Sequence, residues 1–120
     1  MSGTIKMFED ALANLKDVDD IRASAVITRS GLLVTEDIPP EIHAESLAAM
    51  SATMLSAAEI AISELDQGIA NQVIAESNNV KIITMGAGPK MLLVVMANPA
   101  VKLDSILDEM RKAADKIKKL

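Results

Sequence analysis

The stretch SLAAMSATMLSAAEIAISEL, Ser46 to Leu65, decides how the rest of the sequence is read. Its apolar residues recur at helical spacing, which predicts a long helix over roughly residues 41–65. Between Glu45 and Glu59 the stretch carries no charge, although a helix on a protein surface normally has a charged outer side. Ala, Ser and Thr stand in place of charges, so both sides of this helix are predicted to be covered by protein.

The predicted helix has two unlike faces. The face expected to pack on a sheet carries most of the larger side chains: Leu47, Met50, Met54, Leu55, Ala57, Ala58, Ala61, Ile62 and Leu65. The opposite face carries mostly small ones: Ala48, Ala49, Ala52, Thr53, Ser56, Ile60 and Ser63. Small residues let two helices approach closely, and a two-fold dimer needs one self-complementary patch. We therefore predict that the small face packs on the same helix of a second copy; the alternative is a monomer with an Ala-rich helix.

The residues around this helix predict a sheet. ASAVITR (23–29) and LLVTEDI (32–38) are apolar runs joined by Ser30-Gly31, a signal for a tight hairpin. IANQVIAES, VKIITM and MLLVVMA follow the helix as a meander over residues 69–77, 80–85 and 91–97. Helical patterns at both ends run from Ile5 to Leu15 and from Leu103 to Leu120. The order αββαβββα predicts an α+β fold: a five-stranded antiparallel sheet with helices on both faces.

Local signals predict where elements end. Thr4 is the expected N-cap of the first helix, Pro40 is expected in the first turn of the long helix, and Gly68 is expected as its C-cap. IANQVIAES has the mixed polarity of an exposed strand, which can pair with its own copy across a dimer. The predicted dimer interface is therefore Ala49, Ala52, Thr53, Ser56, Ile60, Ser63, Gln72, Val73 and Ile74.

Composition excludes several classes of function. The 120 residues predict one domain, 1–120, and the net charge of −5 argues against nucleic-acid binding. Cysteine is absent and Phe8 is the one aromatic residue, which rules out thiolate sites and disfavours base-stacking platforms. No uninterrupted apolar run reaches the ~18–20 residues of a membrane span, so the chain is predicted to be soluble and cytoplasmic. Five cations after Asp108 form a basic end that suits a helix C-terminus, with contact to a membrane or an acidic partner as the alternative.

No set of residues predicts catalysis. His43 is the one histidine and stands beside Glu41 and Glu45, which is typical of a solvated or capping residue rather than a base or a metal ligand. MGAGPK (85–90) lacks the spacing of a phosphate-binding loop and leads into a strand, so a hairpin turn is predicted. Arg22 and Arg29 bracket the first strand and are candidates for contact with a partner. We predict no catalytic residue, no metal and no cofactor, and hence no enzyme.

The chain resembles the Roadblock/dynein-light-chain family of small-GTPase regulators. The resemblance rests on SAVITRSGLLV, AAMSATMLSAAE, the Gly68 turn, LLVVMAN and the MRKAA helix, and it spans about residues 15–117. Ser30-Gly31 departs from the Asp-Gly of many relatives. The resemblance implies a profilin-like or longin-like fold, a homodimer in which the long helices and the third strands meet, and a Ras-like small GTPase as partner. A light-chain-type adaptor without a GTPase partner and a small-ligand sensor remain as alternatives.

Overall fold

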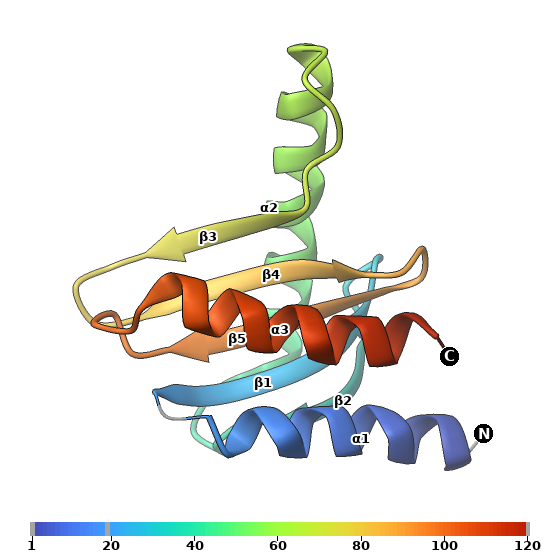
Figure 1. The fold of residues 1–120 in the computed structure, drawn as a ribbon, viewed down its shortest axis with the longest axis vertical. Coiled ribbons are helices and arrows are strands. Elements are labelled where there is room, and N and C mark those ends of the chain that lie inside the picture. Colours follow the sequence, from blue (N-terminus) through green and yellow to red (C-terminus); the bar gives the residue numbers. More distant parts are fainter. Residues whose placement is uncertain (1, 19, 120) are drawn as a thin grey trace.

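Three helices and five strands make up the part of the chain that the structure describes (Figure 1). The structure is a computed structural model that describes residues 2–18 and 20–119. The elements are α1 (Ser2–Lys16), β1 (Ile21–Thr28), β2 (Leu33–Asp37), α2 (Ala44–Glu64), β3 (Gln72–Glu76), β4 (Lys81–Ala87), β5 (Met91–Ala97) and α3 (Leu103–Lys118). The predicted order αββαβββα is confirmed. Leu120, predicted as the end of the last helix, lies outside the described residues.

The strands form an antiparallel sheet in the order β2-β1-β5-β4-β3. β1 and β5 pair in its middle, where Val26, Ile27, Leu93 and Val95 are fully buried. A strand that is covered on both faces needs apolar side chains on both, which explains why the uniformly apolar run MLLVVMA is central. β3, with its mixed polarity, is an edge strand as predicted.

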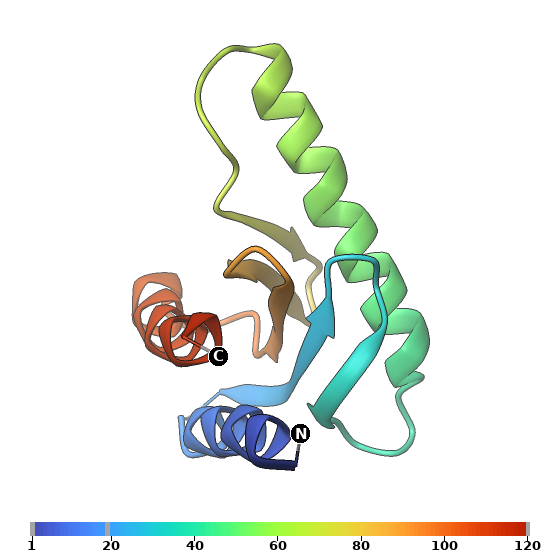
Figure 2. The same cartoon turned by 90° about the vertical axis from the view of Figure 1, so that its right-hand side faces the viewer.

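Helices α1 and α3 cover one face of the sheet and build the larger core (Figures 1 and 2). Its buried side chains are mostly large, among them Phe8, Leu12, Leu15, Ile83, Val95, Ile106, Met110 and Ile117. Full burial of one such side chain stabilises a fold by about 1.5–3 kcal/mol. This layer therefore supplies most of the hydrophobic stabilisation.

Helix α2 covers the other face of the sheet with small side chains (Figure 2). Its buried residues are Ala48, Ser51, Ala52 and Leu55. Met50 is 59% exposed, whereas Ala48 and Ala52 are 2% and 4% exposed. The prediction that the face with the larger side chains packs on the sheet is therefore wrong for Met50, Ala57, Ala61 and Leu65, whereas Leu55 from that face is 1% exposed and does pack on the sheet.

The strands themselves explain why the small residues Ala48 and Ala52 of α2 are buried. On this side of the sheet the large side chains come from Ile27, Leu92 and Val94, so a helix with small residues fits closely over them. The β1–β2 turn also comes near the helix, because a Cβ atom on Gly31 would lie 3.1 Å from the Cα atom of Ala49. Gly31 has a φ of +94°, which favours glycine as well.

The predicted starts of α1 and α2 are wrong. α1 begins at Ser2, so Thr4 lies inside the helix rather than at its N-cap. α2 begins at Ala44, after a turn in which the Ile42 N–H donates to the Pro39 carbonyl at 3.0 Å. Pro40 therefore precedes the helix, because the hydrogen bond between Ile42 and Pro39 closes a separate turn first.

The predicted C-cap of α2 is also wrong. The helix ends at Glu64, and Asp66 takes the left-handed conformation with a φ of 55°. The Asp66 N–H donates to the Ser63 carbonyl at 3.1 Å, and the Gln67 N–H donates to the Ile62 carbonyl at 3.5 Å. This pair of bonds is the Schellman motif, which usually places glycine where Asp66 stands.

Candidate interaction surface

The side of α2 that faces away from the sheet is exposed and uncharged. Its exposed residues between Glu45 and Glu64 are Ser46, Met50, Thr53, Ser56, Ala57, Ile60, Ala61 and Ser63, which together we call the open face of α2. Glu59, the one charged residue inside this stretch, is turned toward Arg29. Large exposed patches without charge mark sites of interaction with protein or membrane.

The C-terminal half of α2 extends beyond the sheet, and a link of residues 65–71 returns from its tip to β3 (Figure 2). Ile60, Leu65 and Ile69 in this region are 65%, 67% and 82% exposed. Covering such a side chain with another apolar surface contributes about 1.5–3 kcal/mol when burial is complete. The tip of α2 is therefore favourably placed to be covered by a second protein surface.

β3 forms a free edge of the sheet and is joined to the tip of α2 by the link of residues 65–71. β3 pairs with β4 along one side and ends the order of strands in the described sheet. Val73 packs toward α2, while Ile74 is 36% exposed and pairs in register with Ile83. The backbone N–H and C=O groups of an edge strand can pair with another strand, so β3 offers a second means of association.

The predicted interface residues fall into three environments. Thr53, Ser56, Ile60, Ser63 and Ile74 are exposed, Ala49, Gln72 and Val73 are half-buried, and Ala52 is buried against the sheet. The assignment of Ala52 to a surface for a second copy is wrong, because its methyl group already packs inside the chain. Met50, Ala57 and Ala61, predicted for the core, lie on the open face of α2 instead. Contact of these residues with a second copy stays a prediction.

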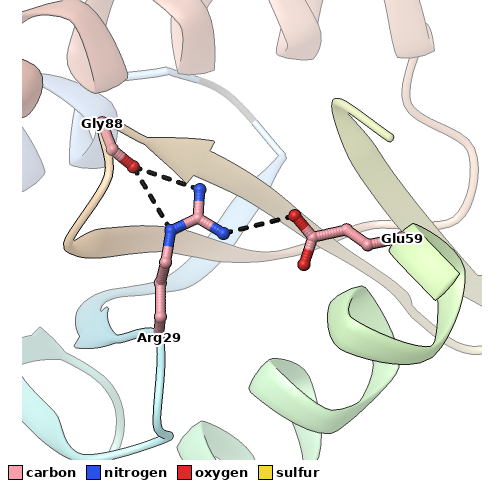
Figure 3. Close-up of polar contacts among 3 residues, drawn as sticks. All are labelled: Arg29, Glu59 and Gly88. Atoms are coloured by element: carbon pink, nitrogen blue, oxygen red, sulfur yellow. Dashed lines mark hydrogen bonds and ion pairs between the residues drawn. The ribbon is translucent and has the colours of Figure 1, made fainter. Parts of the chain in front are cut away.

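A polar contact connects α2 to the end of the sheet (Figure 3). Arg29 Nη1 donates to Glu59 Oε2 at 3.3 Å, and its Nε and Nη2 donate to the Gly88 carbonyl at 3.4 and 3.1 Å. The two charged side chains are 38% and 32% exposed, so solvent screens the pair and its contribution to stability is about 0.2–1 kcal/mol. The contact thus orients α2 against the β4–β5 turn more than it stabilises the fold. The sequence offers no signal that joins residues so far apart in the chain.

Comparison with known proteins identifies the family. The model of the Roadblock/LC7 domain matches residues 7–97. The chain belongs to the Roadblock/LC7 family. MJ0310, an uncharacterized protein of Methanocaldococcus jannaschii, is 32% identical to this Roadblock chain over 112 residues, which are 93% of this chain and 97% of that protein.

Solved structures share the fold of this Roadblock chain. The gliding protein MglB of Thermus thermophilus superposes with a TM-score of 0.85 at 16% identity, over 97% of this chain and 89% of MglB. Profilin II of Acanthamoeba castellanii superposes with a TM-score of 0.65 at 17% identity, over 91% of this chain and 94% of profilin. The predicted Roadblock and profilin-like fold is confirmed.

Helix α2 of this Roadblock chain is apolar enough to be compatible with either a membrane or a protein interior. Among the residues that the structure describes, it is the one helix whose length and composition would let it cross a membrane. Ala48, Ser51, Ala52 and Leu55 nevertheless pack on the sheet of the same chain. Its apolar character is thus explained on one side by packing on the sheet of the same chain.

The remaining candidates for chemistry lie apart. His43 is exposed and occupies the N-cap position of α2 without a side-chain cap hydrogen bond. No three His, Asp or Glu side chains of residues 2–18 and 20–119 are grouped so as to hold a metal ion. The MGAGPK segment forms the end of β4 and the turn into β5, so the predicted hairpin is confirmed. The basic end of α3 places Lys116 and Lys118 in its last turn, where cations interact favourably with the helix dipole.

Proposed function

We propose that residues 1–120 act in the cytoplasm as a non-enzymatic, homodimeric Roadblock module that binds a Ras-like small GTPase and regulates or scaffolds it. The observation that carries the proposal is the open face of α2, an exposed and uncharged helix surface continuous with the tip that extends beyond the sheet. The resemblance to regulators of small GTPases supplies the class of partner.

A second copy of the chain fits both features of this region. Two open faces of α2 can pack on each other because Thr53, Ala57 and Ala61 are small, which allows close approach of the helix axes. The free edge of β3 can pair with the same edge of the second copy, since one two-fold axis serves both contacts. Ile60, Leu65 and Ile69 would then lose their exposure to water.

The arginines support a role in binding rather than catalysis. Arg22 Nη1 donates to the Asn79 carbonyl at 2.8 Å, Arg29 is held by Glu59 and Gly88, and Arg111 Nη1 contacts Asp108 Oδ1 at 3.1 Å. A GTPase activator that supplies an arginine finger needs a guanidinium group directed into the partner's site. In this chain the dimer would instead act as a rigid surface that positions the residues of the GTPase.

Sedimentation velocity at tens of micromolar protein tests the dimer. We expect the wild type to sediment as a dimer and the Ile60→Glu variant as a folded monomer, because an unpaired carboxylate is costly to desolvate. Ile5→Glu is the matched control, since Ile5 is also exposed but lies on α1, across the sheet from α2. A monomeric wild type, or equal effects of the two substitutions, would contradict the proposed interface.

A pull-down with nucleotide-loaded GTPases from the same cells tests the partner. We expect one GTPase to bind in a nucleotide-dependent way, and its rate of GTP hydrolysis or nucleotide release to change when the dimer is added. If the GTPase still binds the Ile60→Glu variant, it recognises a single copy of the chain. Loss of binding to this variant means that the GTPase needs the dimer. Recovery of other proteins alone would indicate a light-chain-type adaptor and would overturn the GTPase assignment.

A further inference from the structure

A cleft of about 430 Å³ opens beside the β4–β5 turn, between the C-terminal half of α3 and the link that precedes β3. Its polar walls carry the cations Arg29, Arg111 and Lys118 and the acids Glu59 and Asp115. Part of its floor is apolar, with Met85 and Ala87 from β4. This volume and this mixture of apolar floor and convergent charged groups are typical of small-molecule sites.

Two glycines shape this cleft. A Cβ atom on Gly86 would lie 3.0 Å from Nη2 of Arg29, so the absent side chain leaves space for the guanidinium group across the floor. A Cβ atom on Gly88 would lie 3.3 Å from the Cα atom of Lys118, so this glycine allows α3 to approach the turn. The arrangement therefore brings Arg29, from the turn that follows β1, and the cations of α3 to one opening.

The cations that line the cleft still have hydrogen-bond donors or positive charge available for a ligand. Arg29 is part-exposed, and its three hydrogen bonds to Glu59 and Gly88 leave two of its five N–H donors unused. Lys118 forms no ion pair within residues 2–18 and 20–119, and Arg111 pairs with exposed Asp108 on its own helix. Guanidinium groups bind carboxylate and phosphate oxygens in a bidentate way, which Glu59 does not achieve here.

We propose that this cleft binds a small molecule that carries a carboxylate or phosphate group. The anionic group would lie between Arg29 and the α3 residues Arg111 and Lys118, and the remainder of the molecule would lie on Met85 and Ala87. Glu59 competes with the ligand, because both carry negative charge and both bind the guanidinium group of Arg29. The site lies on the α3 side of the link, and its proposal does not depend on a GTPase partner.

Titration of the full-length ¹⁵N-labelled chain with inorganic phosphate, and separately with citrate, tests the site at constant ionic strength set by chloride. We expect saturable shifts of the Gly86 and Gly88 amide signals and of the Arg29 Nε–H signal in the millimolar range. Saturation with phosphate or with citrate tells which oxyanion the site prefers. Shifts that grow linearly in both titrations, or that chloride alone reproduces, would overturn the proposal.

Matched variants separate the cleft from general surface charge. Arg111→Gln is expected to weaken binding about two- to five-fold, while Lys112→Gln leaves it unchanged, although each removes one cation and one ion pair within α3. Glu59→Gln is expected to strengthen binding by a similar factor, because the competing carboxylate is gone; Glu109→Gln is its control. Equal effects on binding within either pair would overturn the proposed site. Sedimentation of the same variants measures their oligomeric state independently, so failure of the site and failure of the dimer can be told apart.

Discussion

The two faces of the sheet are covered by helices of opposite character. Beneath α1 and α3 the buried side chains are large, as Phe8 and Met110 show, and the outer side of α3 is charged. Beneath α2 the helix contributes mainly small buried side chains, Ala48, Ser51 and Ala52 beside Leu55, and the hydroxyls of Ser51 and Thr84 are buried without a hydrogen-bond partner among the described residues. The open face of α2, between Glu45 and Glu64, carries no charge. The difference indicates that one layer supplies most of the stability of the fold, whereas the other leaves an exposed helix surface without charge between Glu45 and Glu59.

The largest expected effect on stability comes from truncating a large buried side chain beneath α1 and α3. Phe8→Ala should lower the free energy of unfolding by about 3–5 kcal/mol, because Phe8 is 3% exposed and its removal leaves a cavity. Ile5→Ala on the same helix should cost much less, since Ile5 is 43% exposed. Urea unfolding at one fixed protein concentration measures both. Similar losses would show that this layer is not the main source of stability.

A smaller effect on stability is expected when the same substitution is compared on the two sides of α2. Ala52→Leu should lower the free energy of unfolding by about 1–3 kcal/mol, because added methylenes overpack the contact between helix and sheet. Ala57→Leu makes the same change on the open face of α2 and should leave the fold of one copy unaffected. Urea unfolding at low protein concentration keeps association from contributing. If Ala57→Leu costs as much as Ala52→Leu, the assignment of the two sides is wrong.

The smallest effect concerns the buried hydroxyls. Thr84→Val should raise the free energy of unfolding by about 1 kcal/mol, since valine keeps the shape and removes an unsatisfied polar atom. Thr53→Val is the control, because the exposed Thr53 hydroxyl donates to the Ala49 carbonyl at 2.9 Å. Thermal unfolding of both variants at equal concentration decides the point. No gain from Thr84→Val would mean that its hydroxyl has a partner in solution, such as a water molecule.

Most of the fold was predictable because its signals are local. The apolar run MLLVVMA coincides with β5, Met91–Ala97, and the hairpin at Ser30-Gly31 joins β1 to β2. Ends of elements were less predictable. The strand expected over 69–77 is limited to Gln72–Glu76, since residues 69–71 belong to the link from α2. Asp66 rather than Gly68 ends α2, because an aspartate can also take the left-handed conformation.

The candidate surface was predictable in part. The lack of charge between Glu45 and Glu59 singled out this helix, but the side that packs on the sheet was not predicted correctly, and cover of the other side by a second copy stays a prediction. Ala52 was misplaced because the size of helix residues alone does not tell whether a sheet or a second helix fits them. The contact between Arg29 and Glu59 could not be predicted, since the two residues are 30 positions apart and neither has a distinctive neighbour pattern.

The amino-acid sequence by itself determined the order of the elements, the antiparallel sheet and a long helix with an uncharged stretch, because periodicity and turn residues act within a few positions. The tertiary structure alone decided that Ala48 and Ala52 face the sheet, that Met50 faces outward, and that Arg29 meets Arg111 and Lys118 around one cleft. These outcomes depend on the shapes of surfaces built from distant segments. No local pattern contains that information.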